Sequence, residues 1–239
     1  MELSPGVEAV GLGLYLPSHQ TLVLADLHLG IEESLRRHGV LVPRHHFKEL
    51  VRRVTKILAG LKGVRRIVLN GDLKHEFGSI TDQEWREIKR LIDVLRGEDR
   101  EVVIVKGNHD VMLAPIARDK SVQIVKELVL GDVLVSHGDQ EPVSLDGIKT
   151  VIIGHEHPAI VLRDKAKSEK FKCFLVASYK RRAIIVQPSF GPMTAGMDVL
   201  HGEFLSPLLG ANVKKGRVFV VDEGSKDEVL DFGPLKSFV

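Results

Sequence analysis

Five short apolar runs in the chain each end in a cluster of polar residues. The runs consist of Val, Ile and Leu without polar alternation, which is typical of strands buried on both faces of a sheet. With their polar ends they are TLVLAD (21–26), RIVLNGD (66–72), VVIVKGNHD (102–110), DVLVSHGD (132–139) and TVIIGHEH (150–157). In open α/β sheets, functional residues gather beyond the carboxyl ends of strands, so a site is expected at these five ends.

Two amphipathic helices are predicted between the first three of these strands. Apolar residues recur at steps of three and four from Phe47 to Leu58. A second series follows Thr81, where Thr81 and Glu84 have the spacing of a capping box, and Gly97 is a stop signal. This alternation predicts βαβ units, whereas the closely spaced strands after about residue 125 predict a second sheet packed on the first. We predict one α/β domain over residues 1–239, with two mixed sheets flanked by helices.

The histidine and cysteine content limits the kind of metal site that the chain can form. The 239 residues include 11 His and one Cys, Cys173. A single thiol excludes an intramolecular disulfide framework and a Cys-rich zinc or iron–sulfur site, so imidazole and carboxylate would hold any metal. The net charge of +2 does not mark a dedicated nucleic-acid packaging protein.

No targeting or membrane segment is recognisable in the sequence. Residues 1–20 lack the basic start of a signal peptide, and no apolar run reaches the roughly 18–20 residues of a membrane span. We therefore expect a cytoplasmic protein that does not contact membranes.

The polar strand ends carry residue types that ligate metals. They are Asp26 and His28, then Asp72, then Asn108-His109-Asp110, then His137, and finally His155 and His157. Residues two apart in an extended segment face the same side, so each Asp-x-His or His-x-His pair is predicted to converge. Glycines beside these positions would allow sharp turns and close approach of neighbouring loops. The alternative is that these residues only cap strand ends, but five such ends in register favour a shared site.

The ordered set D-x-H, G-D, G-N-H-D, H-G and G-H-x-H over residues 26–157 resembles the signature of calcineurin-like metallophosphoesterases. The segment ADLHLG is followed by an Arg-rich segment and Val-Pro. This arrangement is most similar to sequences of the branch related to the SbcD nuclease subunit. That branch includes archaeal phosphoesterases and a bacterial ligase-associated endonuclease. The resemblance implies a four-layer α/β/β/α sandwich and two metal ions. One ion would be held by Asp26, His28, Asp72 and His157, and the other by Asp72, Asn108, His137 and His155, with Asp72 bridging.

The resemblance also implies a reaction. Imidazole, carboxylate and amide ligands suit Mn²⁺, which we expect, or Fe, Zn, Ni or Co, and disfavour Ca²⁺. The activity implied is hydrolysis of phosphate esters, above all phosphodiesters including nucleic acid, by a hydroxide that bridges the metals. His109 would protonate the leaving alkoxide, and Asp110 would fix the tautomer of His109. Lys74 and His75 could contact the substrate, although an ordinary loop position is an equal alternative for His75.

Several alternatives stay open at this point. A phosphomonoesterase or phosphoprotein phosphatase could use the same site, and a non-catalytic scaffold is the alternative from another class. Four basic clusters could track a nucleic-acid backbone if they converge on the site, and otherwise form a solvated face. They are Arg36-Arg37, Arg52-Arg53, Lys62 to Arg66 and Lys180-Arg181-Arg182.

The remaining motifs and the partners are interpreted as follows. The segment from Gln187 to Pro192 is either a turn or a wall of the cleft. The other histidines are interpreted as surface or helix residues: His19, His38, His45, His46 and His201. By resemblance, the expected partners are DNA or RNA, a DNA-repair or helicase protein, and a second copy of the chain.

Overall fold

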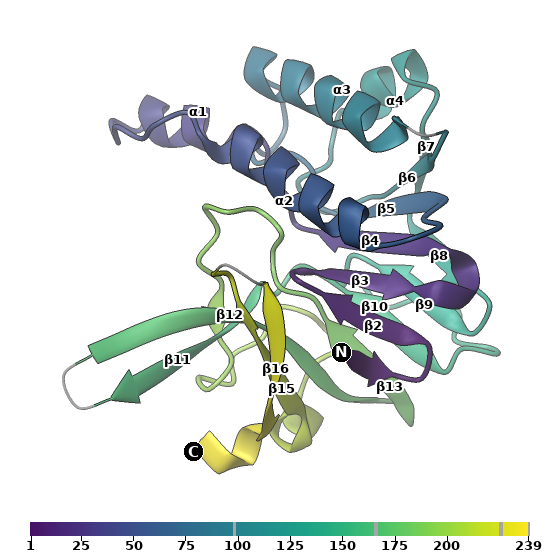
Figure 1. The fold of residues 1–239 in the computed structure, drawn as a ribbon, viewed down its shortest axis with the longest axis vertical. Helices are drawn as coiled ribbons and strands as arrows, with labels where there is room; N and C mark the ends of the chain where they lie inside the picture. The colour runs from purple at the N-terminus through teal and green to yellow at the C-terminus, as the bar shows by residue number, and fades with distance from the viewer. Residues whose placement is uncertain (98, 165–166, 225–226, 239) are drawn as a thin grey trace.

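Two β-sheets pack against each other, and the helices lie over the outer face of the first sheet (Figure 1). The computed structural model describes residues 1–239 except 98, 165–166, 225–226 and 239. A hydrophobic cluster joins side chains of the first sheet, such as Leu24 and Ile67, to side chains of the second, such as Ile152 and Phe174. The predicted sandwich of two mixed sheets is therefore confirmed.

The first sheet contains seven strands among the described residues, in the order β1-β2-β3-β4-β5-β6-β7. Strands β1 to β4 pair antiparallel, and β4 to β7 pair parallel. Their bounds are β1 Glu2–Ser4, β2 Val7–Val10, β3 Gly13–Leu16, β4 Thr21–Ala25, β5 Arg66–Asn70, β6 Glu101–Val105 and β7 Gln123–Val125. The helices are α1 Ile31–Arg37, α2 His46–Gly60, α3 Asp82–Arg96 and α4 Ala114–Asp119, and a 3-10 turn, η1, covers Pro17–His19.

The second sheet runs in the order β14-β11-β12-β13-β10-β9-β8, with β15 on β12 and β16 on β15. Strands β9, β10 and β13 are parallel at its centre. The bounds are β8 Glu127–Leu130, β9 Val133–Ser136, β10 Thr150–Ile153, β11 Pro158–Asp164, β12 Lys167–Tyr179, β13 Arg182–Val186, β14 Met197–Asp198, β15 Arg217–Asp222 and β16 Glu228–Pro234. The β11–β12 hairpin projects from the body of the molecule (Figure 1).

Both faces of the second sheet are buried, which explains its uninterrupted apolar runs. In β10, Ile152 joins the cluster between the sheets, whereas Val151 and Ile153 join a second cluster on the outer face. That outer cluster is closed by Leu208, Val213 and neighbours from the C-terminal part of the chain. In the described residues this fourth layer consists of loops and the 3-10 helices η2 Ala211–Lys215 and η3 Leu235–Phe238, not of α-helices. Helices α1 to α4 all lie on the side of the first sheet (Figure 1).

The capping box predicted for α3 is present and reaches beyond the helix. The Thr81 hydroxyl accepts the Glu84 N–H at 3.1 Å, and the Glu84 carboxylate accepts the Thr81 N–H at 2.8 Å. The same buried carboxylate also accepts the N–H groups of His75 and Glu76, at 3.1 and 2.9 Å. Glu84 therefore ties the start of α3 to the loop that follows β5. In the described residues no helix has the length and apolarity needed to cross a membrane.

Substitution of the two capping residues should have unequal effects on stability. Thr81→Ala removes one cap and should lower the free energy of unfolding by about 1 kcal/mol. Glu84→Ala leaves three N–H groups without an acceptor and should cost at least about 2 kcal/mol. Denaturant unfolding checks both values, with a substitution of the exposed Asp82 in the same turn, Asp82→Ala, as the control within about 0.5 kcal/mol. Equal losses for Thr81→Ala and Glu84→Ala would contradict the wider role of Glu84.

Candidate metal centre

The carboxyl ends of β4, β5 and β6 from the first sheet meet those of β9 and β10 from the second. Two groups of potential ligand atoms lie there, each with all of its atoms within 4.8 Å of one another. One group contains Asp26, His28, Asp72 and His157, and the other contains Asp72, His137 and His155. The side-chain oxygen of Asn108 lies 2.9 Å from His137 Nε2. The structure thus brings together all seven predicted ligands, with Asp72 in both groups.

The donor geometry fits divalent metal ions. His28 Nε2 lies 3.1 Å from His157 Nε2, and His155 Nδ1 lies 3.1 Å from His137 Nε2. Nitrogen ligands about 2.1 Å from one ion are separated from each other by about 3 Å, which matches these pairs. His157 Nε2 also lies 3.5 Å from an oxygen of Asp26. A mixed set of imidazole, carboxylate and amide donors without thiolate suits Mn²⁺, Fe or Zn²⁺.

The ligands converge by a different backbone geometry from the one expected. Asp26 and His28 have φ of 55° and 49°, Asp72 has 46°, and His155 and His157 have 66° and 46°. All five lie in the left-handed region, so the expectation of extended backbone with alternating side chains is wrong at these positions. Non-glycine residues with positive φ cost energy and persist where the surrounding structure imposes them, typically at functional sites.

Two glycines allow the strand ends to approach one another. A Cβ on Gly71 would lie 2.0 Å from His137 Nδ1, and a Cβ on Gly154 would lie 2.6 Å from Asp26 Oδ2. Neither position has room for a side chain unless a ligand moves. The glycines beside the motifs therefore permit the close approach of neighbouring loops that the sequence predicts.

The charges at the centre are strongly coupled. Burial opposes ionisation of Asp72, but His137, His109 and His28 together outweigh burial and hold the pKa of Asp72 below its ordinary value. Burial likewise opposes protonation of His137, yet Asp72 and Asp26 raise its pKa. Burial and the neighbouring His157 lower the pKa of His28, which favours the neutral imidazole. Because a metal ion binds the neutral imidazole, metal binding would displace the proton that the two carboxylates favour on His137.

His109 lies at this centre, but its orienting partner is not the one expected. Its Nδ1 lies 2.5 Å from the His75 carbonyl oxygen, and its Nε2 lies 3.8 Å from Asp72 Oδ2. Asp110 is buried and accepts the N–H groups of Leu73 and Gly107, each at 2.9 Å. The expectation that Asp110 fixes the tautomer of His109 is therefore corrected. Asp110 joins two loops, and the backbone of His75 orients the His109 ring.

Lys74 and His46 also lie differently from the expectation. Lys74 is fully buried, and its ammonium group donates to the carbonyl oxygens of Glu76 and Ser79, so the structure does not bring it to the cleft. His46, interpreted as a surface or helix residue, is the first residue of α2 but is buried. Its Nε2 lies 2.9 Å from the carbonyl oxygen of Leu27, which stands between the ligands Asp26 and His28. No pattern of residue spacing predicts the buried positions of these two residues, so only the packing of the fold shows them.

The segment after β13 forms a buried brace and enters a turn at its end, where the Thr194 N–H donates to the Gly191 carbonyl oxygen. The Ser189 hydroxyl donates to the Asp26 carbonyl oxygen at 2.6 Å, and the Gly191 N–H donates to the same oxygen at 3.2 Å. Lys172 is 6% exposed, and its ammonium group donates to the carbonyl oxygens of Ser189 and Gly191 at 2.8 and 2.6 Å. The second sheet thereby holds the loop that carries Asp26.

Lys172 should give the protein a measurable pH dependence of stability. Burial lowers the pKa of Lys172 from 10.5 to about 8. Between these values the unfolded chain binds more protons than the folded one, so the contribution of Lys172 to stability rises with pH and is lost as the pH falls to 8.

The difference in unfolding free energy between wild type and Lys172→Met should therefore increase by up to about 3 kcal/mol from pH 8 to 10.5. Denaturant unfolding at several pH values measures this difference, in which groups common to both proteins cancel. Parallel pH curves for the two proteins would contradict the lowered pKa.

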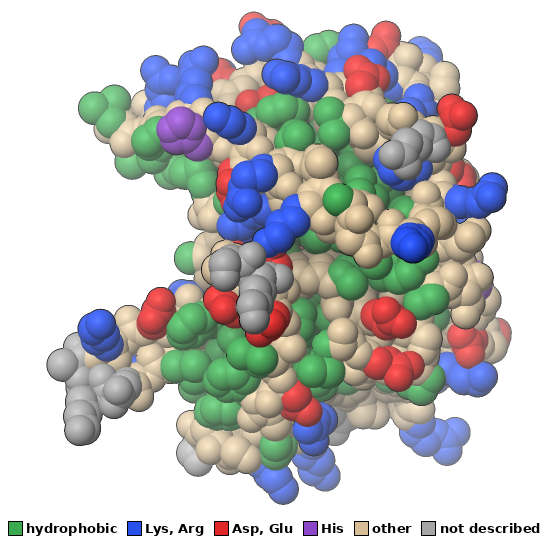
Figure 2. All heavy atoms as spheres, in the orientation of Figure 1, with side chains coloured by type: hydrophobic (Ala, Val, Ile, Leu, Met, Phe, Trp, Pro, Cys, Tyr) green, Lys and Arg blue, Asp and Glu red, His purple; other side chains and the backbone are tan. Residues whose placement is uncertain are grey.

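A cleft of about 760 Å³ opens at the centre, lined by His109, His155 and His157 and by Val161 and Lys170 of the β11–β12 hairpin. Figure 2 shows a hollow between the upper helical layer and this hairpin. The ring of Phe77, 64% exposed, also lines the cleft, with its centroid 3.6 Å from that of His109.

The predicted basic clusters do not line this cleft in the described residues. Arg37, Arg52, Arg66 and Lys180 pair instead with nearby glutamates. In the described residues these clusters therefore lie at the surface outside the lining of the cleft.

Comparison with known proteins identifies the family. The calcineurin-like phosphoesterase family matches residues 19–151, more than half of the chain. The protein belongs to the calcineurin-like phosphoesterase family. This family comprises metal-dependent hydrolases of phosphate esters, and the two ligand groups of this chain are consistent with that chemistry. His155 and His157 lie just beyond the matched residues, on the strand end that the structure brings to the other ligands.

One solved structure supports the fold of this chain. The nuclease MPE of Pseudomonas putida is similar with a TM-score of 0.66 and 20% sequence identity, over 95% of this chain and 94% of that one. The phosphoesterase Yfce of E. coli has a TM-score of 0.41 and 12% identity, over 87% and 95% of the two chains. No curated protein sequence matches the chain. The branch related to SbcD stays a prediction of the sequence.

Proposed function

We propose that the protein hydrolyses phosphodiesters with two divalent metal ions, and that nucleic acid is its substrate class. The observation that carries this proposal is the pair of ligand groups that share Asp72, with His109 beside them in an open cleft. Bound metals would supply an activated water and neutralise the charge of the phosphate. Asp26, His28, Asp72 and His157 would hold one ion, and Asp72, Asn108, His137 and His155 the other, with manganese as the expected metal.

His109 has the geometry of a general acid. Because its Nδ1 faces the His75 carbonyl oxygen, the N–H at this position donates there, and Nε2 is left to face the centre. A proton carried on Nε2 of the imidazolium can pass to the oxygen of the departing group. The backbone of His75 is itself held by Glu84, so the orientation of His109 depends on the cap of α3.

The walls of the cleft favour a diester over a monoester. Among the described residues lining it, Lys170 is the sole Lys or Arg, whereas the dianion of a monoester would call for more cationic groups. Exposed apolar side chains line it as well, notably Phe77 and Leu205. An aromatic ring beside the acid offers a surface on which a nucleobase of the leaving group can stack. The nuclease MPE, which has the same fold, is described as a nuclease, and this is consistent with the proposal.

Metal removal should abolish activity. With Mn²⁺ the protein should hydrolyse bis(4-nitrophenyl) phosphate faster than 4-nitrophenyl phosphate, and EDTA should stop both reactions. Asp72→Asn should lower kcat/KM by more than about 100-fold, since even outer partners of metal ligands cost 10–100-fold. Asp93→Asn, in an exposed ion pair on α3, is the matched control. Activity that ignores EDTA would contradict the proposal, and a preference for the monoester would favour the alternative phosphatase.

Replacement of His109 should separate catalysis from metal binding. His109→Ala should keep the metal content of wild type, because His109 is in neither ligand group, and should lower kcat by about 10²–10⁴-fold. Metal analysis and steady-state kinetics on the same preparation measure the two effects. The loss should be smaller for substrates with good leaving groups, which need less help from an acid. An equal loss for good and poor leaving groups would exclude the acid role.

A further inference from the structure

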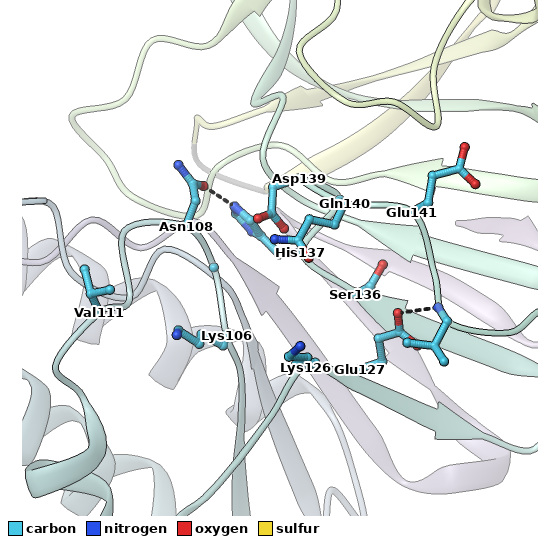
Figure 3. A pocket seen from close by; sticks show the side chains of 13 residues that line it. Lys106, Asn108, Val111, Lys126, Glu127, Ser136, His137, Asp139, Gln140 and Glu141 are labelled. Atoms are coloured by element: carbon cyan, nitrogen blue, oxygen red, sulfur yellow. Dashed lines mark hydrogen bonds between the residues drawn. The ribbon is translucent and has the colours of Figure 1, made fainter. Parts of the chain in front are cut away.

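A second cavity of about 470 Å³ adjoins the metal centre (Figure 3). Asn108 lines both this cavity and the cleft, and His137 lines this cavity, so the two spaces meet at the ligand groups. The other walls come from the residues after β6 and β7 and from the segment after β9. The volume is in the range that binds ligands of the size of a nucleotide.

Two lysines supply positive charge to this cavity. Lys106 directly follows β6 and Lys126 directly follows β7, and these parallel strands are in register up to the preceding residues. The Lys106 N–H donates to the Val125 carbonyl oxygen at 2.9 Å, which holds the two lysines side by side. Neither ammonium group forms an ion pair with any carboxylate of the described residues, and both side chains line the cavity (Figure 3).

Three carboxylates also line the cavity, and two of them are hydrogen-bonded. Glu127 accepts the Val143 N–H at 3.0 Å, and Glu141 accepts the Tyr179 hydroxyl and the Lys180 ammonium at 2.9 and 2.7 Å. The third carboxylate of the lining, Asp139, follows the ligand His137 by two residues.

One polar group in the cavity has no partner. The Ser136 hydroxyl is buried, lines the cavity and finds no hydrogen-bond partner among the described residues. This hydroxyl and the two ammonium groups line the same cavity, and all three are donors that can bind an anion. Lysine binds phosphate as a point charge, without the two-pronged contact of arginine.

We propose that this cavity binds a second phosphate of the substrate, the one that neighbours the scissile phosphodiester along a nucleic-acid strand. Lys106 and Lys126 contact this phosphate, and Ser136 donates a hydrogen bond to it. His109 stands in the cleft, so the leaving group occupies the cleft and the retained part of the strand extends over Asn108 into the cavity. This inference rests on the proposed function and adds a preference for strands over isolated diesters.

The test compares three thymidine substrates with Mn²⁺. The dinucleotide TpT has one phosphodiester, the trinucleotide TpTpT has two, and in a third compound the flanking linkage of the trinucleotide is an uncharged methylphosphonate. Wild type should cleave TpTpT with a kcat/KM per bond at least tenfold above that of TpT. The methylphosphonate compound should behave like TpT, because it keeps the extra nucleoside and lacks the charge.

A double variant assigns the effect to the lysines. In Lys106→Gln/Lys126→Gln the ratio of TpTpT to TpT should fall to near one, and the salt dependence of that ratio should disappear. Lys149→Gln/Lys236→Gln removes the same charge from exposed positions outside both cavities and should keep the wild-type ratio.

The outcomes separate the two proposals. A wild-type ratio near one, or a double variant that keeps the wild-type ratio, overturns the phosphate subsite while Mn²⁺-dependent cleavage of TpT still supports the proposed function. A ratio that persists with the methylphosphonate compound assigns the preference to the extra nucleoside and also overturns it. A protein that cleaves none of these substrates, nor bis(4-nitrophenyl) phosphate, rejects the proposed function itself.

Discussion

Two buried carboxylates, Asp26 and Asp72, link the two sheets at one point. Asp26 ends a strand of the first sheet and accepts the N–H of His155, which follows a strand of the second, at 3.1 Å. Asp72 accepts the N–H of His109 at 3.0 Å, and its own carbonyl oxygen accepts the N–H of His28 at 2.9 Å. Each aspartate therefore holds the backbone of a neighbouring motif while offering its remaining lone pairs to a metal. The ligand residues keep their strained left-handed backbone conformation because these hydrogen bonds fix the backbone from several sides.

Support for this centre extends through buried polar groups that do not touch it. Lys172 and Ser189 hold the loop of Asp26 from the side of the second sheet. His46, at the start of α2, holds the same loop from the side of the helices. Glu84 holds the loop of His75, whose carbonyl oxygen orients His109. A buried polar group without a hydrogen bond costs free energy. Each of these groups therefore keeps its hydrogen bond and holds its partner in place. The sandwich thus keeps the ligand geometry rigid although every ligand sits on a loop.

The two cavities explain how a centre of nearly fixed geometry can have a substrate preference. The ligands and His109 occur on strand ends and would serve any phosphate ester. The exposed Phe77 on one side and the lysines Lys106 and Lys126 on the other belong to loops and strand ends around the centre. These side chains would contact the groups attached to the reacting phosphate, whereas the ligands and His109 act on the reacting phosphate itself. Specificity in such a site depends on its walls, whereas the chemistry depends on its ligands.

The sequence by itself determined the five strands that carry the motifs, the two long helices and the seven candidate ligands, but not the N-terminal strands β1 to β3. Uninterrupted apolar runs reflect burial on both faces, and the motifs at their ends are local patterns that can be read without the fold. The sequence could not show that Asp110 joins loops instead of orienting His109, or that Lys74 turns away from the cleft, because both depend on contacts between distant segments. Nor could it show that the ligand backbone is left-handed, since that conformation is imposed by the crowding of five strand ends. Tertiary packing alone decided which charges are paired, and so which lysines are free to face a phosphate.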